Sequence, residues 1–286
     1  KVRQLVSDRG RDVYVVRSLF DGVEQSVNDK LCRLLFFVGA LKDAAAARVT
    51  VIAPYLCYAR KDRKTKKRDP LTIQYVARMF EAVETDRIVT CDVHNLAAYQ
   101  NAFRIQTEHL IGWHLLIPPI DAAVDDDSIV VVSPDIGGLK RARAFRDVFQ
   151  QTTDQSITLA VMEKKRSEGI VSGEELFGEV EHKTAIIVDD LISTGTTMRR
   201  TIEACRENDA REVFAAATHG ILLEGANDLL AHPGLSQLFV TNTVRPLGAD
   251  TTLIEEKSTV VETSPLFAEV IERLHAGGSV TDLLPL

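Results

Sequence analysis

Two adjacent aspartates, Asp189 and Asp190, end an apolar run and are followed by a loop of small hydroxyl residues, Ser193 to Thr197. The start of the helix expected after this loop offers free backbone N–H groups to a phosphate. Glycine lets the backbone approach the anion, and hydroxyls donate further hydrogen bonds. Carboxylates repel a phosphate, so they are expected to face sugar hydroxyls or a metal ion. The pattern predicts a ligand with a phosphate and ribose-like hydroxyls, although a strand end before a capped helix also fits.

Cations gather at two other places. Seven lysines and arginines occupy the nine positions from Arg60 to Arg68. Like charges this close repel one another unless water or a polyanion faces them. Lys164 and Arg166 form a second basic pair, before residues 168–181, which we expect to form a long loop. Taken alone, this pair is explained equally well as part of a solvated basic loop.

His94 and Asp135 each follow directly after an expected strand. A lone histidine at a strand end is most often a hydrogen-bonded structural residue. Gly137 and Gly138 permit a tight turn between Asp135 and the next helix. The residues alone do not decide whether His94 and Asp135 are structural or belong to a functional site.

The elements that position these residues alternate between short β-branched runs and stretches of helical period. The expected strands are 12–16, 49–54, 87–91, 128–132, 158–161, 184–188, 212–217 and 237–241. Several are apolar at consecutive positions, as in strands buried on both faces. Helices are expected over 72–83, 138–149, 196–207 and 266–275 because their apolar residues recur at helical spacing. This alternation predicts an α/β protein with parallel sheets.

The chain has 286 residues with 45% hydrophobic and 26% charged residues, which is typical of a folded globular protein. A net charge of −7 argues against a nucleic-acid or anionic-membrane partner. The four cysteines are widely spaced, which predicts neither a zinc site nor disulfides and favours a reducing cytoplasm. No apolar run has the length that crossing a membrane requires.

A domain boundary is expected between residues 117 and 128, where two prolines precede three aspartates. The predicted domains are 1–118 and 119–275, with 276–286 packing back on the first. No Walker loop, paired-glycine dinucleotide fingerprint or zinc-protease HExxH motif occurs in the sequence. Three common types of active site are therefore absent.

The stretch VDDLISTGTT resembles the phosphoribosyl diphosphate fingerprint of the type I phosphoribosyltransferase fold. Five further stretches fall in the order and approximate spacing of ribose-phosphate diphosphokinases: PYLCYARK from Pro54, CDVH from Cys91, SPDIGGLK from Ser133, THG from Thr218 and VTNT from Val240. The resemblance covers almost the whole chain. The Ser-Thr-Gly form of the loop is similar to the archaeal-like class of these enzymes.

The resemblance implies two type I phosphoribosyltransferase-like domains, each a mostly parallel sheet flanked by helices. It implies the transfer of the diphosphoryl group of ATP to ribose 5-phosphate, with Mg²⁺ as cofactor. Arg60, Lys61 and His94 then contact ATP, His94 and Asp135 hold the magnesium ion, and Lys164 and Arg166 are catalytic. Ribose 5-phosphate is bound by Asp189, Asp190, Ser193, Thr194, Gly195, Thr196 and Thr197.

The family also implies a homo-oligomer in which a neighbouring subunit completes the ATP site. Family members carry an N-terminal segment that Lys1 to Gly10 does not match, so we expect this segment to be missing here. Two alternatives stay open. One is a non-catalytic, synthetase-associated regulatory subunit, and the other is a phosphoribosyltransferase that joins a base to the diphosphate.

Overall fold

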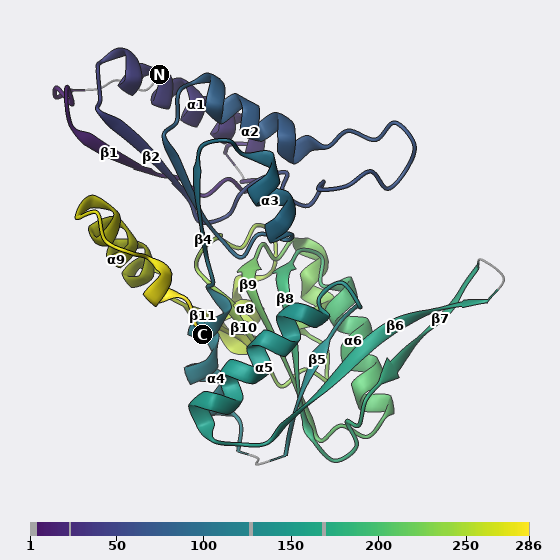
Figure 1. The fold of residues 1–286 in the computed structure, drawn as a ribbon. Helices are drawn as coiled ribbons and strands as arrows, with labels where there is room; N and C mark the ends of the chain where they lie inside the picture. The colour runs from purple at the N-terminus through teal and green to yellow at the C-terminus, as the bar shows by residue number, and fades with distance from the viewer. Residues whose placement is uncertain (1–4, 23, 126–127, 168–169, 286) are drawn as a thin grey trace. The chain divides into compact units, whose positions relative to one another are not determined.

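The computed structural model describes residues 5–22, 24–125, 128–167 and 170–285, and the side chains of residues 164–174 lie outside the description. The chain divides into two compact units (Figure 1). Unit 1 comprises Lys1–Ile111 and Ser264–Leu284, and unit 2 comprises Gly112–Thr263 and Pro285–Leu286. Each unit has a mostly parallel sheet and helices, which confirms the predicted fold class. The domain limits at 118/119 and 275/276 stay a prediction.

Unit 1 is built on a four-stranded parallel sheet in the order β1-β2-β3-β4. Its strands are β1 (Asp12–Val16), β2 (Arg48–Ala53), β3 (Arg87–Cys91) and β4 (Gln106–Leu110). Crossover helices join the strands, as parallel pairing requires; they are α1 (Val27–Asp43), α2 (Thr72–Ala82) and α3 (Leu96–Ala102). The late helix α9 (Ser264–His275) also belongs to this unit. Because successive strands run the same way, their carboxyl ends meet at one edge.

Helix α1 is absent from the helices expected from the sequence. Ser26 caps it through a reciprocal capping box with Asp29. Leu34, Leu35 and Val38 are buried in the core of unit 1. The run from Leu34 to Leu41 is almost continuously apolar, so it lacks the polar positions that make helical periodicity visible.

Unit 2 contains a seven-stranded sheet in the order β11-β10-β9-β8-β5-β6-β7. Its strands are β5 (Ile129–Ser133), β6 (Ile157–Ser167), β7 (Ile170–Phe177), β8 (Thr184–Ile192), β9 (Glu212–Gly220), β10 (Gln237–Thr241) and β11 (Ser258–Val261). Its helices are η1 (Trp113–Leu116), α4 (Ile117–Ala123), α5 (Leu139–Thr153), α6 (Thr196–Glu207), η2 (Glu224–Ala226), α7 (Asn227–Leu230) and α8 (Thr251–Lys257). Every neighbouring pair of strands is parallel except β6 and β7.

The expected long loop over residues 168–181 is wrong, because β7 occupies Ile170–Phe177 and pairs antiparallel with β6. Glycine and glutamate make this stretch locally resemble a loop. Its strand conformation depends on hydrogen bonds to β6, which a local pattern does not reveal. The expected boundary stretch also contains α4, whose prolines lie in the first turn, where a helix tolerates them.

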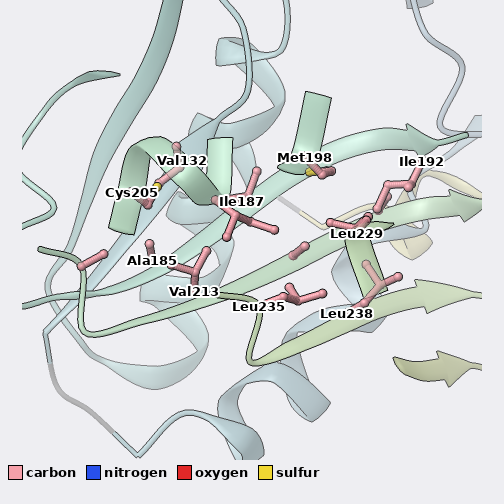
Figure 2. Packing of buried hydrophobic residues seen from close by; sticks show 14 of the residues in the cluster. Val132, Ala185, Ile187, Ile192, Met198, Cys205, Val213, Leu229, Leu235 and Leu238 are labelled. Carbon is pink, nitrogen blue, oxygen red and sulfur yellow. The ribbon is translucent and has the colours of Figure 1, made fainter. Parts of the chain in front are cut away.

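The core of unit 2 joins α6 to the sheet beneath it. Figure 2 shows Met198 and Cys205 of this helix packed beside strand residues such as Ala185, Ile187 and Val213. Burial raises the pKa of Cys205 to about 12, so the thiol stays protonated and packs as an apolar group. Helix α6 is thereby held at a fixed place at the carboxyl end of β8.

None of the described helices combines the length and apolar composition needed to cross a membrane.

Candidate functional site

The site in unit 2 lies where the direction of strand addition reverses. After β5 the chain adds β6 on one side, and it later returns to add β8 on the other side. Ligands of open parallel sheets bind beyond the carboxyl ends of the strands at such a switch point. Asp135 follows β5, and Asp189 and Asp190 lie near the end of β8. The topology therefore brings these acidic residues to neighbouring strand ends.

Both aspartates of β8 contact a single arginine, Arg141. Its Nη1 atom lies 2.6 Å from Asp189 Oδ1, and its Nη2 atom lies 3.0 Å from Asp190 Oδ1. The side chains of Arg141 and Asp190 are only 16% and 7% exposed, so water screens these ion pairs weakly. Arg141 lies in the first turn of α5, which begins just after the turn at Asp135. Sequence reasoning missed this residue, because its contact with the acids depends on β5 and β8 being neighbours in the sheet.

The surroundings of the acid pair disfavour the ionised form of Asp189. Burial and the charge of Asp190 raise the pKa of Asp189 to about 7, while Arg141 acts in the opposite direction. The backbone N–H of Asp190 also donates a hydrogen bond to Asp189 Oδ1, at 2.8 Å. The site thus holds two neighbouring carboxyl groups whose negative charge is offset in part by one guanidinium.

The hydroxyl loop after β8 forms an open helix N-terminus. Helix α6 begins at Thr196, and no side chain caps its first turn. Thr194, Thr196 and Thr197 are exposed, and the hydroxyls of Thr194 and Thr196 lie 3.1 Å apart. Gly195 adopts a φ of +76°. Uncapped N–H groups and clustered hydroxyls make a receptor suited to a phosphate.

The loop is braced from the next strand connection. The backbone N–H of Leu223 donates to the carbonyl of Ser193, at 3.0 Å. A Cβ atom on Gly195 would lie 2.7 Å from Leu229 Cβ, so glycine is required for space as well as for its backbone angle. The loop therefore has a fixed shape before any anion arrives.

A buried hydroxyl network stiffens the ends of β9 and β10. His219 Nδ1 lies 2.8 Å from Thr243 Oγ1, and Thr241 Oγ1 donates to the carbonyl of Thr218 at 2.6 Å. All four residues are buried. The residues that follow this strand end include Leu223, so the network supports the brace on the hydroxyl loop.

Asp135 is exposed just beyond the end of β5. Its Oδ1 atom accepts a hydrogen bond from the backbone N–H of Gly138 at 2.7 Å, which shapes the turn into α5. A Cβ atom on Gly138 would lie 2.9 Å from Ser133 Oγ and 3.5 Å from Arg141 Nη1. Glycine at position 138 therefore leaves room for the Ser133 hydroxyl at this turn, which leads into the helix that carries Arg141.

In unit 1 the expected ATP residues follow the neighbouring strands β2 and β3. Arg60 and His94 are both exposed. Asn95, next to His94, donates from Nδ2 to Asp62 Oδ2 at 2.6 Å, which joins the two loops. The structure therefore brings the Arg60 and His94 loops together at one edge of the sheet.

Lys61 has a local partner in the basic loop. Its Nζ atom lies 2.9 Å from Asp69 Oδ2, and Asp69 also accepts hydrogen bonds from Thr65 and Lys66. The Lys61 side chain, followed by Thr65 and the Lys66 backbone, holds the pKa of Asp69 well below its usual range. Lys61 therefore shapes the loop that presents Arg60.

Other expected residues fall in different places. His94 lies in unit 1 and Asp135 in unit 2. Lys164 and Arg166 lie on β6, in register with Glu174 and Val171 of β7, but their side chains lie outside the described residues. Across the parts of the chain that the structure describes, no three His, Cys, Asp or Glu side chains cluster to hold a metal.

Comparisons with known proteins agree along almost the whole chain. A family model described as the N-terminal domain of ribose phosphate pyrophosphokinase matches residues 1–83, and one described as the phosphoribosyl synthetase-associated domain matches residues 135–285. The ribose-phosphate pyrophosphokinase of Caldanaerobacter subterraneus subsp. tengcongensis is 38% identical, over 97% of this chain and 84% of that protein. Ribose-phosphate pyrophosphokinase 4 of Saccharomyces cerevisiae is 35% identical, over 96% of this chain and 80% of that protein.

A solved structure shows the same fold. The crystal structure of phosphoribosylpyrophosphate synthetase from Mycobacterium smegmatis matches with a TM-score of 0.85 and 33% identity, over 96% of this chain and 86% of that chain. The expected resemblance is thereby confirmed in both sequence and fold. The chain belongs to the ribose-phosphate pyrophosphokinase family, whose members are also called ribose-phosphate diphosphokinases.

Proposed function

We propose that the chain transfers the diphosphoryl group of ATP to the anomeric hydroxyl of ribose 5-phosphate, giving 5-phosphoribosyl 1-diphosphate and AMP for nucleotide biosynthesis. The hydroxyl oxygen attacks the β-phosphorus, and the bond from this phosphorus to the α–β bridging oxygen breaks. AMP leaves with that oxygen, and the proton of the hydroxyl is released. Positioning and charge stabilisation carry most of the catalysis in such a transfer.

One observation carries the proposal: an acid pair and an uncapped, hydroxyl-rich helix start lie together at the switch point of unit 2. A sugar phosphate has the complementary chemistry, with hydroxyls at one end and an anion at the other. Asp189 and Asp190 accept hydrogen bonds from the ribose hydroxyls. The loop of Ser193, Thr194, Gly195, Thr196 and Thr197 binds the 5-phosphate.

On the ATP side, the exposed cation Arg60 binds the nucleotide. Lys61 supports it, because its contact with Asp69 shapes the same loop. His94 follows the neighbouring strand, and its loop is joined to the Arg60 loop through Asn95 and Asp62. Lys164 and Arg166 act on the transferred group, because two cations offset the charge that develops in the transition state.

The donors available suit Mg²⁺ bound together with the nucleotide. Mg²⁺ prefers oxygen ligands and keeps several waters, and Asp135 offers a carboxylate that is already oriented by Gly138. His94 would supply the second protein ligand, with phosphate oxygens and water as the remaining ligands. When bound, the ion neutralises phosphate charge. The remaining work of positioning the substrates falls to the residues of the chain.

We further propose that the chain forms a homo-oligomer in which a neighbouring subunit completes the ATP site, and that it acts in the cytoplasm. The described cysteines are free, which fits a reducing compartment. The Ser-Thr-Gly loop supports a place in the archaeal-like class.

The decisive experiment measures AMP formation from ATP and Mg²⁺, with and without ribose 5-phosphate. We expect AMP only when the sugar phosphate is present. Asp190→Asn is expected to lower kcat/KM for ribose 5-phosphate by about tenfold or more, because hydrogen bonds to a charged acceptor are the strong ones. Asp121→Asn, an exposed position on α4, is the matched control and should retain wild-type rates.

Two outcomes would support the alternatives. If the chain forms no AMP, a regulatory subunit is favoured, and Lys164→Ala should then leave its effect on a partner synthetase unchanged. Release of diphosphate from phosphoribosyl diphosphate only when a free base is added would indicate a phosphoribosyltransferase. Loss of AMP formation in Lys164→Ala would instead support the proposed catalytic role.

A further inference from the structure

Arg141 occupies the position between the two carboxylates that the proposed function assigns to the ribose hydroxyls. Its two terminal nitrogens reach different residues, Nη1 to Asp189 and Nη2 to Asp190. Each contact uses the Oδ1 atom of its carboxylate. One rigid, planar group therefore fixes the orientation of both acidic side chains at once.

We infer that Arg141 is a positioning residue for ribose 5-phosphate, which holds Asp189 and Asp190 in the geometry that receives the sugar hydroxyls. This inference rests on the proposed function. It adds a residue of helix α5 to the pair Asp189 and Asp190, which the sequence shows only as neighbours at the end of one strand.

Consecutive residues of a strand direct their side chains to opposite faces, so Asp189 and Asp190 do not share a direction by default. Two neighbouring carboxylates also repel each other, most strongly where water is excluded. A guanidinium that contacts both carboxylates offsets part of this repulsion and draws them toward a common point. The backbone N–H of Asp190, 2.8 Å from Asp189 Oδ1, restrains the same oxygen further.

The turn before α5 leads directly into the helical turn that carries Arg141. Asp135 shapes this turn through the N–H of Gly138, and Arg141 Nη1 lies 3.5 Å from where a Cβ atom on Gly138 would be. Glycine at this position leaves the space beside the guanidinium free of a side chain. The two ion pairs already hold the arginine against the acids, which lowers the cost of ordering the site when the sugar binds.

Charge balance supports the same role. The charged groups that act on Asp189 are Asp190 on its own strand and Arg141 on α5, while the facing residue of β9 is the neutral Ala217. Asp190 raises the pKa of Asp189 and Arg141 lowers it. Loss of the guanidinium would therefore extend the pH range over which Asp189 is protonated, and so weaken it as an acceptor.

The test measures binding of ribose 5-phosphate by calorimetry from pH 6 to pH 9, together with steady-state KM values for both substrates. Arg141→Gln removes both the positive charge and the planar guanidinium group that reaches two carboxylates. Arg141→Lys keeps the charge but has a single side-chain nitrogen. Arg143→Gln is the matched control, because Arg143 is exposed on the same helix. The calorimetric measurement of binding requires no catalytic turnover, so it tests this inference separately from the proposed reaction.

For Arg141→Gln we expect the Kd and KM for ribose 5-phosphate to rise about tenfold or more, with the KM for ATP unchanged. Its binding should also require a higher pH than wild type. Arg141→Lys should keep the wild-type pH dependence but still bind the sugar phosphate weakly. Arg143→Gln should match wild type in both respects.

Wild-type affinity and pH dependence in Arg141→Gln would overturn the inference, even if the variant melts earlier. An equal rise in the KM for ATP and for ribose 5-phosphate would also overturn it, because general loosening affects both substrates. If Arg141→Gln does not fold, Arg141→Lys decides through its affinity alone. Failure of the wild-type chain to bind ribose 5-phosphate would instead contradict the proposed function.

Discussion

Asp189 has a carboxyl group whose ionised form is disfavoured in the folded state. Burial and Asp190 raise its pKa from 3.8 to about 7. A group with a raised pKa stabilises the fold when protonated, and this contribution is lost as the pH rises through the folded pKa. We therefore predict that Asp189→Asn unfolds at a higher temperature than wild type at pH 8. At about 1.4 kcal/mol for each unit by which the pKa is raised, the gain should reach a few kcal/mol.

The comparison across pH identifies the cause of this gain. Near pH 4 the wild-type carboxyl is already protonated, so the two proteins should have nearly the same free energy of unfolding. Asp121→Asn, at an exposed position, should follow wild type at both pH values. Equal stability of Asp189→Asn and wild type at pH 8 would contradict the prediction. The variant should also lose affinity for ribose 5-phosphate, as expected where binding requires a charge that destabilises the folded state.

The acid pair and the hydroxyl loop can be predicted from sequence because strand, loop and helix start follow one another within a dozen residues. Arg141 cannot be found in this way. It lies 48 residues before Asp189 in the chain, and the two meet only because β5 and β8 are neighbours in the sheet. Hydrophobic periodicity reveals that each strand exists but not which strands are adjacent.

At the scale of elements, the hydroxyl loop depends on a glycine that no other residue can replace without cost. Gly195 has a φ of +76°, and an added Cβ atom would lie 2.7 Å from Leu229 Cβ. Leu229 is fully buried and cannot easily withdraw. We predict that Gly195→Ala destabilises the protein by about 2–4 kcal/mol, from the backbone angle and from overpacking together. Chemical denaturation measures this loss.

Gly10→Ala separates the two contributions. Gly10 has a nearly equal φ of +73°, but nothing lies within 4 Å of its added Cβ atom. This variant should show the backbone cost alone, about 1–2 kcal/mol. Gly195→Ala should in addition bind ribose 5-phosphate more weakly, because the loop must shift. Equal losses in the two variants would show that Leu229 does not constrain the loop.

Elements with a clear pattern are predictable, and those defined by their partners are not. The apolar runs of β3 and β10 and the amphipathic face of α6 give the observed bounds directly. Strand β4 has the sequence QTEHL, which contains one apolar residue and shows no strand pattern. It forms because it extends the sheet beside β3. Strand β7 likewise depends on β6.

At the scale of the whole molecule, the C-terminal helix belongs to the unit that begins the chain. The period of Leu266, Val270 and Leu274 shows that α9 has one apolar face. It does not show which sheet this face covers. The structure places α9 in unit 1, where the ring of His275 lies 6.3 Å from that of Tyr14 on β1, edge to face. Unit 1 therefore combines Lys1–Ile111 with the later segment Ser264–Leu284.

This arrangement predicts that the two units respond differently to a cavity in α9. Leu274 is 5% exposed and adjoins His275. Leu274→Ala should destabilise unit 1 by about 2–3 kcal/mol, the usual cost of such a cavity. Hydrogen exchange measured by mass spectrometry should show faster exchange in β1 and β2, with β8 and β9 unchanged. Val260→Ala on β11, where the side chain is 44% exposed, should change neither unit measurably. Faster exchange in β8 and β9 alone would mean that α9 stabilises unit 2 instead, and would overturn the assignment of this helix to unit 1.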